Sequence, residues 1–179
     1  MMYTKQNMES QQMTRTAKAS VLCGGLIVAA GCIASFVPQL QMIALAFMFV
    51  LNTGLHLAVW RRSVKRGKAM GATLSMTLTE AWFLLMLLAF FSSGKPSAAL
   101  LLAAYAFYQI THGSSLLTIP TGLSRTLGVL AFAMGTLTLF IPVPAIIGAG
   151  IMLNGAERLI MALVNRNDQS KANKSLTGQ

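Results

Sequence analysis

Six long apolar stretches, separated by short polar breaks, constrain the fold of this chain more than any other feature. Each stretch approaches the roughly 20 residues that an α-helix needs to cross about 30 Å of hydrocarbon. Charged residues make up 10% of the chain, against about a quarter in a typical soluble domain. We therefore predict an all-α, polytopic membrane protein with six transmembrane helices. The predicted helices cover residues 19–37, 41–60, 72–92, 97–118, 124–141 and 144–164.

The two ends of the chain are polar and lack helical periodicity. Residues 1–18 are rich in Gln and Met, and residues 166–179 read RNDQSKANKSLTGQ. Segments with so few apolar residues cannot bury enough surface to fold by themselves. We predict two disordered cytoplasmic tails around one membrane domain over residues 19–165.

The basic residues give the chain a net charge of +10, and their placement indicates orientation. They gather in alternate breaks between the apolar stretches and in the two ends, which leaves Lys95 alone on the opposite side. Because cytoplasmic loops of membrane proteins carry the excess of Lys and Arg, both termini are predicted to be cytoplasmic. The break after the second stretch is the most basic and suits anionic lipid headgroups, so we expect membrane lipids and not nucleic acid as partners. Its cations are Arg61, Arg62, Lys65, Arg66 and Lys68.

An internal repeat organises the apolar stretches into three helical hairpins of about fifty residues each. The pairs Gly31/Pro38 and Gly135/Pro142 have the same seven-residue spacing. The segment LNTGLHL at 51–57 is echoed by LNGAERL at 153–159. The middle hairpin is a weaker copy of the other two.

This plan resembles that of the HdeD-like membrane proteins, a family associated with acid resistance in enteric bacteria. The resemblance covers residues 19–166 and depends on the three hairpins, the Gly/Pro pairs and the Asn-Gly elements of the even-numbered stretches. It implies a multi-pass protein of the bacterial inner membrane with a role in acid or envelope stress. It implies no reaction and no catalytic residue.

Polar residues inside the apolar stretches are the candidate functional residues, since ionisable groups are expensive within a membrane. His56, His112 and Glu157 lie in related segments of the three even-numbered stretches, about 6, 9 and 12 Å from the cytoplasmic interface. With Asn52 and Asn154 they form a predicted cytoplasmic polar layer. Either the layer changes charge as the cytoplasm acidifies, because histidine titrates near neutral pH, or its members pair internally and fix the helix register.

Two further ionisable groups, Glu80 and Arg158, lie inside the apolar stretches. Glu80 is either about 12 Å deep or close to the surface, and Trp82 as an interfacial residue favours the surface. Glu157 and Arg158 project about 100° apart around one helix, so each is expected to pair with a different helix or with lipid.

Small residues at four-residue spacing predict close helix contacts, because they let two backbones approach each other. They are expected either to pack helices one, five and six together or to supply a surface for a homo-oligomer or another membrane protein. The candidates are Gly25, Ala29, Gly31, Ala131 and Gly135.

Signatures of enzymes and cofactors do not occur in the sequence. There is no P-loop, HExxH, GxSxG or dinucleotide fingerprint, and no cysteine or histidine pair has zinc-ligand spacing. We therefore expect a non-enzymatic protein without catalytic, cofactor-binding or metal-binding residues. The alternative to a stress-tolerance protein is a small transporter or channel subunit that moves protons or a small solute, which three hairpins with embedded polar groups also suit.

Overall fold

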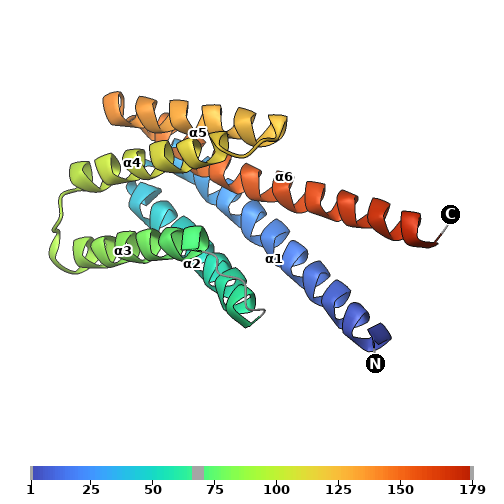
Figure 1. The fold of residues 1–179 in the computed structure, drawn as a ribbon. Coiled ribbons are helices and arrows are strands. Elements are labelled where there is room, and N and C mark those ends of the chain that lie inside the picture. The colour runs from blue at the N-terminus through green and yellow to red at the C-terminus, as the bar shows by residue number, and fades with distance from the viewer. Residues whose placement is uncertain (1, 66–70, 178–179) are drawn as a thin grey trace.

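The computed structural model describes the backbone of residues 2–65 and 71–177, and the side chains of residues 17–62, 64 and 74–164. Within those ranges every regular element is a helix, and six of them are α-helices (Figure 1). The predicted all-α fold is confirmed. The elements are α1 (Met2–Phe36), the short 3-10 helix η1 (Pro38–Leu40), α2 (Gln41–Lys65), α3 (Gly71–Ser93), α4 (Ala98–Leu117), α5 (Gly122–Phe140) and α6 (Pro144–Thr177).

Five of the helices are long and apolar enough to span a membrane, as a polytopic helical membrane protein requires. The exception is α4, which has 20 residues but carries Gln109, His112 and Ser114 in its second half. Two of these three polar side chains, Gln109 and His112, are buried inside the protein. The lower hydropathy of α4 therefore reflects an interior polar face. The five apolar spans are Ala17–Phe36, Pro38–Arg62, Leu74–Ser93, Gly122–Phe140 and Pro144–Val164.

Helix ends follow local chemistry. Gly94 ends α3 with a φ of 69°, a left-handed conformation that glycine adopts without steric penalty. Ser97 caps α4 by accepting a hydrogen bond from the Leu100 amide, and Thr121 caps α5 in the same way through Ser124. The turns between predicted helices are thus encoded by residues that terminate or start helices.

The structure differs from the sequence analysis at both ends of the chain. Helix α1 begins at Met2 and α6 continues to Thr177, so both helices extend through the segments predicted to be tails. Extending an existing helix is far easier than starting one, and Gln, Met, Lys and Ala are good helix formers. The apolar parts of these helices, Ala17–Phe36 and Pro144–Val164, match the predicted spans closely.

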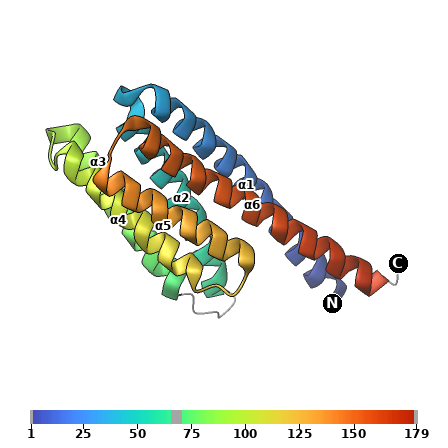
Figure 2. The same cartoon turned by 90° about the horizontal axis from the view of Figure 1, so that it is seen from above.

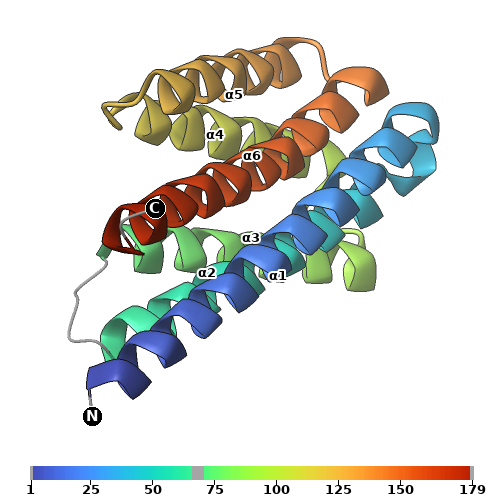
Figure 3. The ribbon, with the colours of Figure 1, turned by 90° about the vertical axis from the view of Figure 1, so that its right-hand side faces the viewer.

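The helices that pack most closely are not the partners within the three predicted hairpins, which are α1 with α2, α3 with α4, and α5 with α6. Helix α1 packs mainly against α6, α4 against α5, and α2 against α3 (Figures 2 and 3). Each odd-numbered helix therefore pairs with the even-numbered helix that precedes it, if α6 is taken to precede α1. Each of the three pairs therefore joins helices from two different predicted hairpins.

Glycine contacts hold two of these pairs at short range. An added Cβ on Gly24 would lie 2.8 Å from the carbonyl oxygen of Gly155, and one on Gly31 would lie 2.7 Å from that of Gly148. The pair α4 and α5 repeats this pattern. Its contacts are Gly128 with Gly113 and Gly135 with Ala106, at 2.8 and 2.7 Å. Backbones this close allow extensive van der Waals contact, which is the main attraction between helices in lipid.

Large apolar side chains cover the outside of the bundle. Phe36 is 86% exposed, Trp82 67% and Leu88 65%. A soluble protein rarely exposes so much contiguous apolar surface, but a lipid-facing surface is expected to. Inside, Phe49 stacks on Phe83 with ring centroids 4.2 Å apart, and Tyr105 and Tyr108 meet Phe49 edge to face.

Candidate functional site

A connected series of ionisable side chains lies in the interior of the bundle, beside these aromatic rings. Its first member is Glu80 on α3, whose side chain is fully buried. One carboxylate oxygen lies 2.8 Å from His56 Nδ1 on α2, and the other accepts a hydrogen bond of 2.9 Å from the Tyr108 hydroxyl on α4. Glu80 thus joins three helices through its two oxygens.

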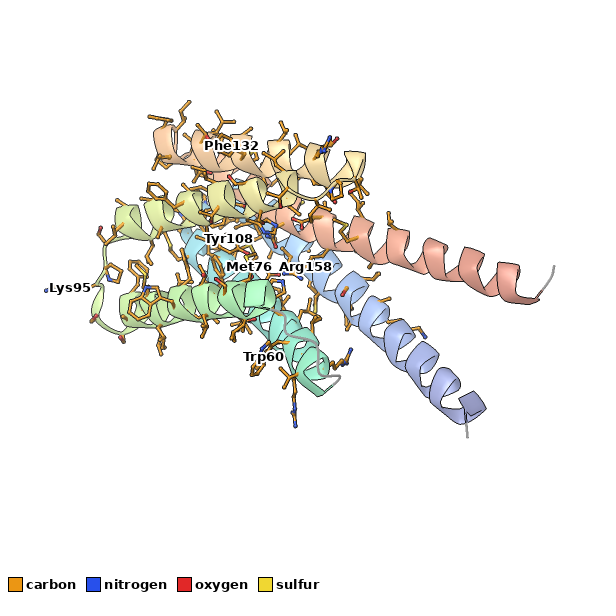
Figure 4. The ribbon with its side chains drawn as sticks, in the orientation of Figure 1. Trp60, Met76, Lys95, Tyr108, Phe132 and Arg158 are labelled. Atoms are coloured by element: carbon orange, nitrogen blue, oxygen red, sulfur yellow. The ribbon has the colours of Figure 1, made fainter. Side chains whose placement is uncertain are left out.

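Arg158 on α6 reaches the other side of the His56 ring. Its Nη2 lies 3.1 Å from His56 Nε2, and Figure 4 labels Arg158 and Tyr108 in the middle of the bundle. A guanidinium can only donate, so Nε2 accepts and carries no proton. The ring proton is therefore on Nδ1 and is donated to Glu80. His56 is neutral in this arrangement, with its tautomer fixed by a donor on one side and an acceptor on the other.

His112 and Glu157 form the second ionisable pair. His112 Nε2 on α4 lies 2.7 Å from a carboxylate oxygen of Glu157 on α6. The side chains are 10% and 14% exposed. The opposite ring nitrogen, His112 Nδ1, is buried and has no hydrogen-bond partner among the described residues. The two histidines therefore have different surroundings, although each lies beside a glutamate.

Polar contacts also connect the even-numbered helices to each other. Asn52 Nδ2 on α2 donates to Asn154 Oδ1 on α6 at 2.8 Å. On α4, Gln109 Nε2 lies 3.0 Å from the Gly150 carbonyl oxygen of α6. Because α2, α4 and α6 are otherwise held by few close backbone contacts, side-chain hydrogen bonds contribute much of their mutual attachment.

We define the ionic network as six ionisable side chains. They are linked by the contacts of Glu80, His56 and Arg158, by the contact of His112 with Glu157, and by the parallel rings of Tyr108 and His112, whose centroids are 5.9 Å apart. The network contains two carboxylates and one guanidinium, so its formal charge is −1 when both imidazoles are neutral. One added proton makes the network neutral. Its members are His56, Glu80, Tyr108, His112, Glu157 and Arg158.

The predicted polar layer corresponds to part of this arrangement. Its five residues, His56, His112, Glu157, Asn52 and Asn154, all make hydrogen bonds to other helices. The expectation that Glu157 and Arg158 pair with different helices is confirmed, since their partners lie on α4 and α2.

The side chain of Glu80 is fully buried inside the bundle, and its depth below the cytoplasmic interface stays a prediction. Trp82 is exposed two residues further along α3, but a step of two residues turns a helix by about 200°. The indole and the carboxylate therefore face opposite sides of α3. Tyr108 was not expected from the sequence, since a tyrosine in an apolar helix gives no signal of a buried carboxylate partner.

The predicted packing residues separate into two groups. Gly31 and Gly135 are at close backbone contacts, and Ala131 is buried. Gly25 and Ala29 are exposed, and an added Cβ on Gly25 would meet nothing within 4 Å. The neighbouring Gly24 faces α6 instead, because each residue turns a helix by 100°. Gly24, and not Gly25 or Ala29, therefore makes the close contact of this part of α1 with another helix of the chain.

Of the predicted lipid-binding cations, Arg61 and Arg62 are exposed at the end of α2. Lys65 is the last residue of that helix, and its side chain is not described. Arg66 and Lys68 lie outside the described residues.

The fold and the ionic network together define a polytopic helical membrane protein with an ionisable interior. No family model matches the chain, and no curated protein and no solved structure matches it either.

Proposed function

We propose that this chain is a non-enzymatic protein of the bacterial inner membrane, with both termini cytoplasmic, that supports tolerance of acid or envelope stress. The observation that carries the proposal is the ionic network. Placing charged side chains inside a membrane costs about 2.5–3.5 kcal/mol each on insertion scales. A chain that places three charged side chains and two imidazoles, all buried or partly buried, on four helices has a strong reason to use their charge.

Acidification provides that use. The network links α2, α3, α4 and α6 through carboxylates and imidazoles, whose hydrogen bonds depend on where protons reside. A change in protonation therefore alters the contacts that connect the three helix pairs. The protein responds to acid by repacking within the membrane, and passes the change to lipid or to another membrane protein.

The aromatic cluster argues for a response to acid over continuous conduction. Phe49, Phe83 and Tyr105 pack together next to the network and are buried. Phe49 precedes His56 on α2 by seven residues, and Tyr105 precedes His112 on α4 by the same number. Two turns of helix correspond to about 10 Å, so the rings close the network on the side away from the cytoplasm.

Acid survival tests the proposal. A strain that lacks the gene is complemented with the wild type, with His112→Gln and with Glu157→Gln, at equal protein abundance in the membrane. Both network variants are expected to lose most of the protection that the wild type gives. Glu9→Gln is the matched control, since Glu9 precedes the first apolar span. Full protection by both network variants would refute the proposal.

A small transporter or channel subunit for protons or a small solute is the second candidate. The observation that favours it is that the network lies between helix pairs held mainly by side chains, where two pairs could rock against each other. Proton flux into proteoliposomes separates the two candidates. Flux that is abolished in the His112→Gln, Glu157→Gln double variant would favour transport, whereas equal leakage with and without protein would favour the stress-tolerance role.

A further inference from the structure

The two histidines of the ionic network offer different atoms to an incoming proton. His56 has one unprotonated nitrogen, Nε2, and that atom already accepts a hydrogen bond from Arg158. Protonating it would break this bond and place a cation against a cation. Each oxygen of Glu80 likewise accepts a hydrogen bond, one from His56 and one from Tyr108.

His112 presents the opposite situation. Its Nε2 donates to Glu157, and its Nδ1 is a basic nitrogen with no partner among the described residues. A proton on Nδ1 breaks no existing hydrogen bond, and the new N–H has no acceptor among the described residues. The proton forms one N–H bond, comes from solvent water, and turns the contact with Glu157 into an ion pair.

The formal charge of the network sets how many protons it takes up. Two carboxylates and one guanidinium leave a charge of −1, which a low-dielectric interior disfavours. One proton on His112 neutralises it, whereas a second on His56 would overcharge it. We infer that the ionic network holds one exchangeable proton, bound on His112 against Glu157, and that His56 stays neutral as a fixed link between Arg158 and Glu80.

The charged and titratable groups around His112 support this assignment. Helix α6 presents Glu157 and Arg158, α3 presents Glu80, α2 presents His56, and α4 itself presents Tyr108. Helix α5 packs against α4 at Gly128 and Gly135, among other residues, and the only charged residue of α5 is Arg125 in its first turn. The nearest charged partner of His112 is thus a carboxylate.

The inference builds on the proposed acid response but is tested independently of it. The chain contains two histidines, so ¹⁵N-histidine labelling of the full-length protein, purified with a histidine-free tag in lipid nanodiscs, yields signals from two rings. The variants His56→Gln and His112→Gln assign them. The ring nitrogens report tautomer and protonation directly.

Between about pH 8 and about pH 5, where histidine ordinarily titrates, the His112 ring is expected to become doubly protonated. The His56 ring should keep a protonated Nδ1 and an unprotonated Nε2 throughout. Protonation of His56 before His112, protonation of both rings together, or two neutral rings across the whole range would each overturn the inference.

Two substitutions test the charge argument itself. Glu157→Gln leaves Glu80 balanced by Arg158, so His112 should now stay neutral over the same range. Arg158→Met removes the donor that opposes His56 and leaves two carboxylates, so both rings should become protonated. If either variant fails to fold, as judged by gel filtration and helical circular dichroism, the wild-type titration still decides. Proton uptake by His112 without an acid-survival defect would refute the proposed function and leave this inference intact.

Discussion

At the scale of single residues, Glu80 has the most demanding surroundings in the ionic network. Its carboxylate is fully buried and accepts from two neutral donors, His56 Nδ1 and the Tyr108 hydroxyl. A carboxylate accepts at both oxygens, whereas an amide accepts at only one. The site therefore selects Glu over Gln, although the two side chains have nearly the same shape.

Glu80→Gln should consequently destabilise the protein by about 3 kcal/mol, the order expected when one partner of a buried charged contact is lost. Its NH₂ group would face a donor, either His56 Nδ1 or Tyr108, that then lacks an acceptor. Tyr108→Phe removes one hydrogen bond and should cost only about 1 kcal/mol. Reversible unfolding of the reconstituted protein measures both, and equal losses would contradict this description of the site.

The repeat predicted more of this site than the position of any single residue did. Aligning LNTGLHL with LNGAERL matches Asn52 with Asn154 and His56 with Arg158, and each matched pair is in contact. Glu80 lies outside the repeated segments, and only the rotation of α3 places it next to His56. That rotation depends on contacts between helices far apart in the sequence, such as Phe49 with Phe83.

At the scale of helices, glycine determines which pairs approach most closely. Gly31 of α1 leaves room for the Gly148 carbonyl oxygen and the Met152 amide of α6, both of which would lie 2.7 Å from an added Cβ. These are backbone atoms, so no side-chain rotation relieves the overlap. One methyl group at this position must push the two helices apart.

Gly31→Ala should therefore destabilise the protein by about 1–3 kcal/mol, the usual range for overpacking. Gly25→Ala is the control from the same helix, since an added Cβ there meets nothing within 4 Å. It should be neutral or gain up to about 1 kcal/mol from helix propensity. Thermal unfolding of the two variants in one lipid mixture compares them, and a larger loss for Gly25→Ala would contradict the helix faces described above.

The sequence predicted the helices well and their pairing only in part. Apolar length and terminating residues such as Gly94 are local, so most boundaries were within reach of the sequence. The choice of α6 as the partner of α1 is not local. It depends on glycines in register, Gly24 with Gly155 and Gly31 with Gly148, whereas a single-sequence pattern offers Gly25 equally well as Gly24.

At the scale of the whole molecule, each of the three helix pairs contains one even-numbered helix, and these helices carry most of the ionic network. The three hairpins therefore act as one unit, because each pair contains helices from two hairpins. Contacts such as His112 with Glu157 then connect one pair to the next. Removing or displacing a single hairpin would break two pairs, so the molecule should unfold in one cooperative step.

Orientation in the membrane is a property of the whole chain and is testable with single cysteines. After Cys23 and Cys32 are replaced by Ala, Ser93→Cys places a thiol at the end of α3, next to the turn that holds Lys95, and Ile119→Cys places one between α4 and α5. Lysine and arginine resist translocation, and Lys95 is the one basic residue in the turns that the charge pattern predicts to lie outside. Ser93→Cys should react with a membrane-impermeant maleimide in intact cells, and Ile119→Cys only after permeabilisation. The reverse pattern would put the ionic network in the outer half of the membrane, where its proton would equilibrate with the periplasm and acid survival would depend on external rather than cytoplasmic pH.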